Sequence, residues 1–195
     1  NNRKEFRFID FYKISNFILQ YLKNNVQYKE MSLEHLRTYF YTGEYSENLL
    51  QKIEKLLADG YDNKVVNDLL IKAKKDREKQ VNFFKLAKNY YFFEVRAKPL
   101  QLSYSDLKIV QKGVDVQLAV DLVDFAHKNI FDVAVVLSGD IDLLESVKAV
   151  KNMGKQVILL GDKESIAEEM KKYADFLIDI SRFTGEQLDA FSHVP

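Results

Sequence analysis

The stretch that decides the fold is Val133-Ala-Val-Val-Leu-Ser-Gly-Asp-Ile-Asp142, an apolar run that ends abruptly in small and acidic residues. Continuous apolar runs rich in β-branched residues are typical of a parallel strand covered on both faces. Open α/β sheets bind their ligands just past the carboxyl ends of such strands. Ser138 and Gly139 permit a tight turn there. We therefore expect a buried strand that delivers the carboxylates of Asp140 and Asp142 to one edge of the sheet.

A further carboxylate is expected at the same edge from the segment Lys112-Gly-Val-Asp115, which has the pattern of a loop-to-helix junction. Carboxylate oxygens are hard ligands that suit Mg²⁺ or Mn²⁺. A metal ion bound there can activate water for in-line attack on a phosphodiester. The spacing thus favours a divalent-metal site formed by Asp115, Asp140 and Asp142. The alternative is that Asp115 and Asp142 are simply helix caps.

The carboxyl-terminal half alternates helices and strands. We expect helices over 114–129, 142–152 and 164–174, and strands over 133–137, 156–160 and 176–180. This order predicts a parallel, doubly wound sheet with right-handed crossovers. Apolar positions run almost all round the first of these helices, so we expect it to be deeply packed. The residues after 180 are expected to form a short appended segment with a frayed tail.

The amino-terminal half is expected to be mostly helical, with helices over 10–23, 46–59 and 63–89, strands over 35–41 and 90–96, and a loop over 99–111. Thr42-Gly43 is expected to stop the first strand. Ser46 and Asp10 are positioned as helix caps. Asp10 follows Phe8-Ile9, so the alternative is a catalytic acid at a strand end, but a helical pattern begins at once and favours the cap.

Composition limits the function classes. The 195 residues carry 29 Lys and Arg against 29 Asp and Glu, so any nucleic-acid surface must be local. The basic stretch over 72–79 favours a solvated helix face, with an arm that grips phosphates as the alternative.

The absence of cysteine excludes disulfides and thiolate chemistry. His35, His127 and His193 are scattered, so the sequence indicates neither a zinc site nor a histidine base. No apolar segment approaches the roughly 20 residues of a membrane span, so we expect a cytoplasmic protein without a membrane partner.

Three runs in this sequence together resemble the NYN domain family, which includes the LabA-like proteins and belongs to the PIN-like nuclease superfamily. They are 111–122, 136–142 and 154–158. The resemblance covers about residues 90–180 and extends loosely over the helices before them. It implies a three-layer α/β/α, Rossmann-like fold with a mainly parallel sheet. It also implies one domain over 1–180, with a helical insertion at about 46–89 and a carboxyl-terminal extension over 181–195.

The same resemblance implies a ribonuclease that uses Mg²⁺ or Mn²⁺ and takes RNA as its partner. Four acids match the family's motif acids and are the expected metal ligands: Asp115, Asp121, Asp140 and Asp142. We expect Asp115, Asp140 and Asp142 to be catalytic as well. Lys112 and Ser138 are the expected contacts of the substrate phosphate. The oligomeric state stays open, with a homodimer as one alternative, because the tyrosines at 39, 41, 90 and 91 could be core, base-stacking or dimer residues.

The chain departs from the family pattern in two places. Family members begin with a strand of the form Phe-Ile-Asp-Gly-x-Asn, whereas Phe8-Ile9-Asp10 lacks the glycine and the asparagine. We therefore expect the first central strand, and one acid, to lie upstream of Asn1. Leu143-Leu144 also replaces the family's phenylalanine and proline, so either the turn or the following helix is expected to differ.

Two further function classes stay open. One is a non-catalytic regulatory protein that keeps the fold and binds RNA, a nucleotide or another protein, and a metal titration separates it from a nuclease. The other is a small-molecule phosphatase or phosphotransferase, for which Asp140 and Asp142 have the right spacing but no supporting lysine and threonine are evident.

Overall fold

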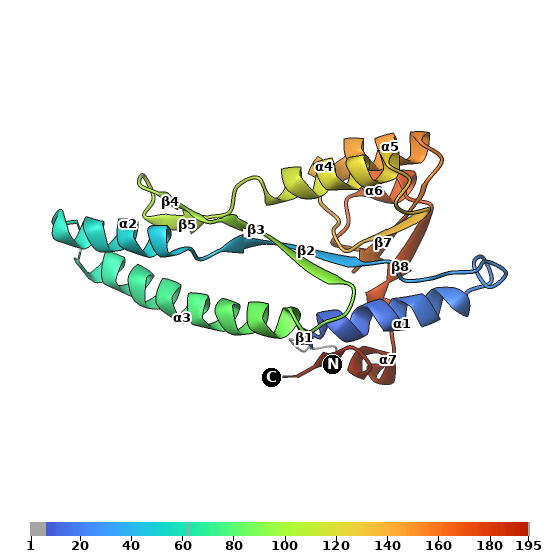
Figure 1. Cartoon of the computed structure of the whole chain (residues 1–195), viewed down its shortest axis with the longest axis horizontal. Coiled ribbons are helices and arrows are strands. Elements are labelled where there is room, and N and C mark those ends of the chain that lie inside the picture. The colour runs from blue at the N-terminus through green and yellow to red at the C-terminus, as the bar shows by residue number, and fades with distance from the viewer. Residues whose placement is uncertain (1–6, 62, 195) are drawn as a thin grey trace. The chain divides into compact units, whose positions relative to one another are not determined.

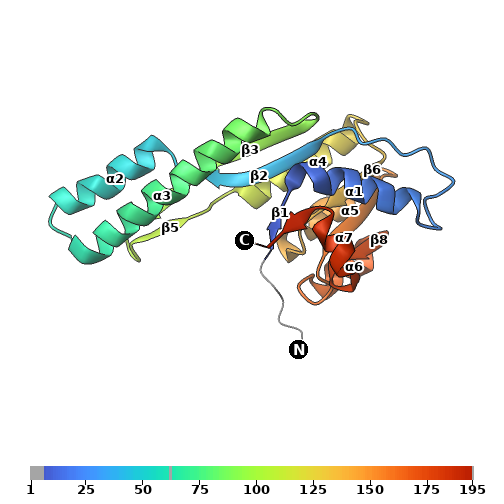
Figure 2. The ribbon, with the colours of Figure 1, turned by 90° about the horizontal axis from the view of Figure 1, so that it is seen from below.

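The computed structural model describes residues 7–61 and 63–194, which divide into two compact units. One unit comprises Asn1–Thr38 with Asp121–Pro195, and the other comprises Tyr39–Val120. Figure 1 labels most elements of both, and Figure 2 labels β6 as well. Helix α4 (Val114–His127) belongs partly to each unit.

The first unit is built on a parallel sheet of three strands in the order β6-β7-β8. Its elements are β6 (Val133–Val136), η1 (Ile141–Leu143), α5 (Leu144–Asn152), β7 (Gln156–Gly161), α6 (Glu168–Tyr173) and β8 (Phe176–Asp179). Val135 is aligned with Ile158, and Ile158 with Phe176. The predicted alternation and the parallel pairing are confirmed, although α6 is shorter than the helix expected over 164–174.

The core of this unit surrounds the middle strand β7, where Val157, Ile158 and Leu159 are fully buried. Helix α1 (Phe11–Lys23) contributes three apolar residues at helical spacing to the cluster that contains Ile158: Ile14, Ile18 and Leu22. The Asp10 carboxylate accepts hydrogen bonds from the backbone nitrogens of Tyr12 and Lys13, at 3.1 and 3.0 Å. The prediction that Asp10 caps the helix is therefore confirmed.

Strand β6 is less buried than its sequence predicts. Val135 is 39% exposed and Leu137 is 46% exposed, so the expectation of a strand covered on both faces is wrong here. The reason is its position, because among the described residues β6 pairs within its sheet with β7 alone. An apolar run does not reveal whether its strand lies at the edge of a sheet.

The two ends of the described chain pair with each other. Strand β1 (Phe8–Ile9) runs antiparallel to β9 (Ser192–His193), so the Phe8-Ile9 strand is not part of the β6-β7-β8 sheet. Residues 1–6, which precede β1, lie outside the described residues. Between β8 and β9 the chain forms η2 (Ile180–Arg182) and α7 (Gly185–Asp189), and Phe191 is only 3% exposed. The expectation of a frayed tail is wrong, because this phenylalanine anchors the segment in the core.

The second unit contains a helical hairpin, α2 (Glu47–Ala58) and α3 (Asn63–Ala87), and Figures 1 and 2 both show these helices side by side. Its strands form two sheets of two strands each. One pairs β2 (Thr38–Glu44) with β3 (Phe93–Pro99), and the other pairs β4 (Gln101–Ser103) with β5 (Lys108–Val110). Ser46 caps α2 as predicted, since its hydroxyl accepts a hydrogen bond from the Leu49 nitrogen. The buried stripe of α2 packs in one cluster with α3 and Leu102.

Three strand boundaries in this unit differ from prediction. Strand β2 continues through Gly43 to Glu44. Leu100 packs closely on this glycine, because a Cβ at position 43 would lie 2.3 Å from the Leu100 Cδ2 atom. Strand β3 begins only at Phe93, since Phe92 adopts the left-handed conformation with φ 55°. The expected loop over 99–111 is a hairpin, with Leu102 opposite Ile109.

Helix α4 is not packed all round as its composition predicts. Val116 is 64% exposed and Val120 is 60% exposed. The helix also ends two residues early, at His127, and Asn129 then adopts a left-handed conformation with φ 54°. Among the described residues, no helix is both long and apolar enough to cross a membrane.

We predict that replacing Tyr28 by phenylalanine leaves the free energy of unfolding at pH 7 unchanged or raises it by up to about 1 kcal/mol. Tyr28 is 1% exposed, and its hydroxyl has no hydrogen-bond partner among the described residues. Burial, and then the nearby Asp175 carboxylate, raise the pKa of this phenol above 10.0. The wild type should therefore lose stability as the pH rises above that value, and the variant should lose less. Urea unfolding of the wild type and the variant, at pH 7 and at a pH above 10.0, measures the free energy of unfolding. A markedly lower value for the variant at pH 7 would contradict the prediction.

Candidate metal site

Asp140 and Asp142 lie on one tight turn at the carboxyl end of β6. The Asp140 carboxylate accepts a hydrogen bond of 3.0 Å from the Asp142 nitrogen and thereby caps η1. The Ser138 hydroxyl accepts one of 3.3 Å from the Asp140 nitrogen. Both acidic side chains are exposed. The turn therefore presents two carboxylates, two residues apart, to the solvent.

The conformation of this turn depends on a close contact between Gly139 and Ile166. A Cβ atom on Gly139 would lie 2.7 Å from the Cα atom of Ile166, which leaves no room for a side chain. The Ala167 nitrogen donates a hydrogen bond of 3.1 Å to the Gly139 carbonyl oxygen. Ile166 is only 3% exposed and also lies against Gly161 at the end of β7. The loop that follows β7 thus packs directly on the turn that carries the acids.

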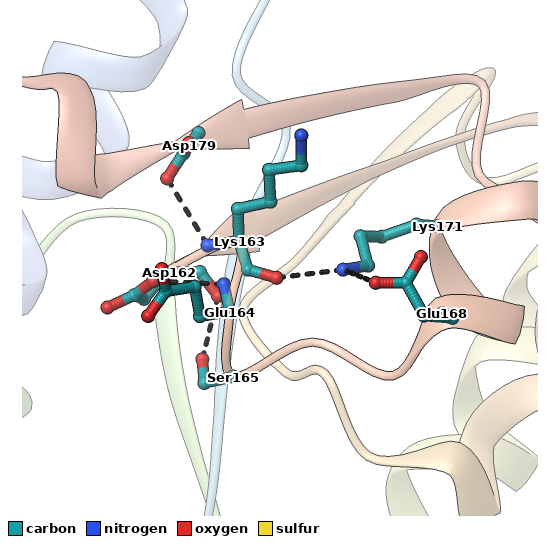
Figure 3. Close-up of polar contacts among 7 residues, drawn as sticks. All are labelled: Asp162, Lys163, Glu164, Ser165, Glu168, Lys171 and Asp179. Carbon is teal, nitrogen blue, oxygen red and sulfur yellow. Dashed lines mark hydrogen bonds and ion pairs between the residues drawn. The ribbon is translucent and has the colours of Figure 1, made fainter.

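Two more acids lie at the ends of β7 and β8, but they bind the protein's own backbone (Figure 3). The Asp162 carboxylate accepts a hydrogen bond of 3.0 Å from the Glu164 nitrogen. The Asp179 carboxylate accepts hydrogen bonds from the Lys163 nitrogen at 3.2 Å and from the Ser181 hydroxyl at 2.7 Å. These contacts shape the loop over 162–167 and the chain after β8. We therefore assign Asp162 and Asp179 structural roles.

The pKa of Asp179 reflects this role. Burial by itself would raise it, because only 10% of the side chain is exposed. The Ser181 hydroxyl, the backbone nitrogens of Lys163 and Ser181, and the Arg182 guanidinium outweigh burial, so the pKa is lowered. The carboxylate therefore stays ionised at neutral pH, with its oxygens engaged in holding the loop.

The structure places the two remaining acids of the expected site on α4. Asp115 is the second residue of the helix and is exposed, and Asp121 is partly buried. Six residues of α-helix separate them by about 9 Å along the axis and about 120° around it, so they point in different directions. Among the described residues, no three Asp, Glu or His side chains gather closely enough to hold one ion. Asp140 and Asp142 are the pair that the structure brings together.

The alternative of helix capping applies to a different acid than expected. Asp140, and not Asp142, caps the short helix η1. Asp115 lies inside the first turn of α4 and not before it. The replacement at Leu143-Leu144 does not remove the next helix, because Leu143 is 1% exposed in the core and α5 begins at Leu144.

The expected phosphate contacts lie in different units. Ser138 lies in the turn after β6, and Lys112 is exposed just before α4 in the 39–120 unit. The basic stretch over 72–79 contributes ion pairs between helices: Lys74 with Glu54 at 2.8 Å, and Arg77 with Glu47 at 2.9 Å. These pairs favour the solvated helix face over a phosphate-gripping arm.

The sequence did not predict the role of Ile166, because an isoleucine in a polar loop gives no sign that it packs against Gly139.

The turn at Asp140 and Asp142 lies within a match to a family model, that of the NYN domain, over residues 4–181. The chain belongs to the NYN domain family. NYN domains are part of the PIN-like superfamily, whose nucleases generally act on RNA and use divalent metals. An NYN chain with helices and a parallel sheet is consistent with a PIN-like α/β fold.

Two individual proteins are also similar to this NYN chain. An uncharacterized protein of Methanocaldococcus jannaschii is 30% identical over 73 residues, which are 37% of this chain and 30% of that protein. The chain thus spans less than a third of the length of the curated relative that it matches. The crystal structure of a protein of unknown function from Vibrio parahaemolyticus is similar over 84% of this chain and 100% of that one, with 18% identity and a TM-score of 0.46.

We predict that the variant Gly139→Ala is destabilised by about 1–3 kcal/mol, because the added methyl group must displace the backbone at Ile166. Gly185→Ala is the matched control, since nothing lies within 4 Å of a Cβ at that position. Urea unfolding of both variants measures the difference. Equal stability of the two would contradict the packing of the loop on the turn.

Proposed function

We propose that the protein is a divalent-metal-dependent ribonuclease of the NYN type that hydrolyses RNA phosphodiesters with an activated water. The observation that carries the proposal is the pair Asp140 and Asp142, exposed on one turn at the carboxyl end of a parallel strand in an NYN chain. The neighbouring acids Asp162 and Asp179 are engaged by backbone nitrogens.

The donor atoms of this pair suit magnesium or manganese. A magnesium ion in proteins usually takes one or two carboxylates and completes its octahedron with water and substrate phosphate oxygens. The Asp142 carboxylate has no hydrogen bond or ion pair within the described part of the chain, and the Asp140 side chain holds only the Asp142 nitrogen. A bound ion would lower the pKa of a water molecule and neutralise charge on the leaving oxygen.

The other expected residues complete the proposal. Asp115 and Asp121 serve as additional metal ligands, and Lys112 and Ser138 contact the scissile phosphate. Asp115, Asp140 and Asp142 act in catalysis. We also propose the three-layer PIN-like arrangement for the domain over 1–180, with 46–89 as its helical insertion and 181–195 as its extension.

The proposal predicts that Asp140→Asn and Asp142→Asn each lower the rate of metal-dependent cleavage of single-stranded RNA by about 100-fold or more. An amide removes the negative charge but keeps the size of the side chain, so the fold should be preserved. Asp124→Asn is the matched control, because Asp124 makes only an exposed pair with Lys128 on α4, which is worth little. Cleavage of a labelled RNA with Mg²⁺ or Mn²⁺ measures the rates. Full activity of the Asp140→Asn variant would contradict the proposal.

A second candidate is a non-catalytic protein that keeps the NYN fold and binds RNA or a protein partner. One observation favours it: the described residues contain no group of three metal-ligating side chains. This candidate predicts that the wild type binds RNA without cleaving it at any concentration of Mg²⁺ or Mn²⁺. Metal-dependent cleavage that Asp140→Asn abolishes excludes it.

A further inference from the structure

The 39–120 unit contains a pocket of about 620 Å³ whose polar lining comes from separate segments of the chain. Ser46, Asn48 and Lys52 come from the start of α2, Lys98 from β3, Tyr104 from the β4–β5 turn, and Lys112 from the segment before α4. We propose that this pocket binds one nucleotide of single-stranded RNA, with the lysines on its phosphate and Tyr104 against its base. The inference rests on the proposed function only in taking RNA as the partner.

The charge of the lining selects an anion. Lys52, Lys98 and Lys112 line the pocket, and no aspartate or glutamate is among its described lining residues. None of these lysines forms an ion pair within the part of the chain that the structure describes. The acids of α2 on either side of Lys52 are held elsewhere, Glu47 by Arg77 and Glu54 by Lys74. Positive charge without neighbouring carboxylates attracts phosphate groups, although the chain as a whole is neutral.

Local packing holds the backbone that carries Lys98 and Lys112 in place before any ligand arrives. A Cβ atom on Gly113 would lie 3.6 Å from the Lys98 ammonium nitrogen, so the Lys98 side chain lies beside the residue that follows Lys112. Gly113 has a φ of +73°, which favours glycine at this position. The hairpin between these lysines is held to the end of β2 at both of its ends. The Leu100 nitrogen donates to the Glu44 carbonyl oxygen at 2.9 Å, and the Gln111 side-chain oxygen accepts from the Gly43 nitrogen at 3.0 Å. A site arranged in advance loses less entropy on binding.

The shape of the site favours a nucleotide over a bare phosphate ion. Its volume falls within the range of pockets that hold small organic ligands, about 300–1,000 Å³. Tyr104 is 56% exposed at the lining, so its ring is accessible to a planar base. Stacking of a base on an aromatic side chain is worth about 1–3 kcal/mol and tolerates any base. A free mononucleotide offers the same phosphate and ring, so the experiment must separate it from RNA.

The test measures binding of a fluorescent single-stranded RNA of uridines by anisotropy, with EDTA present so that no cleavage occurs. Lys52→Ala should weaken binding and reduce the slope of log K against log salt by about 0.7, the value for one phosphate contact on a single strand. Tyr104→Ala should weaken binding about 5-fold or more, the equivalent of the loss of one stacked base. The matched control is Lys75→Ala, an exposed lysine on α3 without an ion pair among the described residues.

Wild-type affinity for both Lys52→Ala and Tyr104→Ala would overturn the inference, as would an equal loss in the Lys75→Ala control. Both altered side chains are exposed, so folding of the variants is expected, and urea unfolding verifies it. Uridine monophosphate distinguishes the ligand sources. The inference expects it to compete only weakly with RNA, whereas tight binding of the mononucleotide alone would overturn the assignment to RNA.

The failure of this inference is distinguishable from failure of the proposed function. RNA binding in EDTA depends on the pocket, and cleavage with Mg²⁺ depends on Asp140. Loss of binding in Lys52→Ala, together with full cleavage by Asp140→Asn, would support the pocket and refute the nuclease site. Unchanged binding in Lys52→Ala and Tyr104→Ala, together with loss of cleavage in Asp140→Asn, would do the reverse.

Discussion

The close contact of Gly139 with Ile166 is the constraint on which the candidate site depends. A Cβ on the glycine would lie 2.7 Å from the Ile166 backbone, so only a residue without a side chain fits between β6 and the loop after β7. This contact sets the direction in which the chain leaves β6. The Asp140 and Asp142 carboxylates follow immediately and are exposed because the chain turns there. The position of two acids thus depends on the packing of one buried isoleucine.

The carboxyl edge of the sheet carries two kinds of acid, which differ in what they bind. Asp179 is mostly buried and accepts backbone and hydroxyl hydrogen bonds, and these contacts lower its pKa. Asp140 and Asp142 are exposed and leave carboxylate oxygens available to a ligand. The difference separates acids that hold a loop from acids that can hold an ion. The proposed lysine pocket of the 39–120 unit would add a further source of affinity for phosphate, and its described lining contains no aspartate or glutamate.

Local features of the structure could be predicted from the sequence, and long-range features could not. The cap at Asp10 and the turn at Asp140 involve neighbours in the chain, so their residue types reveal them. The exposure of Val135 depends on which strand ends the sheet, and the need for a glycine at position 43 depends on the distant Leu100. Pairing of β1 with β9 joins opposite ends of the chain and leaves no local pattern. For the candidate site, the pairing of Asp140 with Asp142 was predictable because only Ile141 lies between them in the sequence. Whether Asp115 lies near them depends on tertiary structure, which the local sequence does not reveal.

The proposed nuclease requires the turn after β6 to bind a divalent metal ion. Paramagnetic broadening of backbone amide signals by substoichiometric Mn²⁺ in nuclear magnetic resonance spectra tests it most directly, because the effect falls steeply with distance from the ion. A metal ion at this turn should selectively broaden the amides of residues 138–142. Mg²⁺ should reverse the broadening by competition, and the Asp140→Asn variant should lack it. Broadening that leaves these amides unaffected, or that persists unchanged in Asp140→Asn, would contradict it.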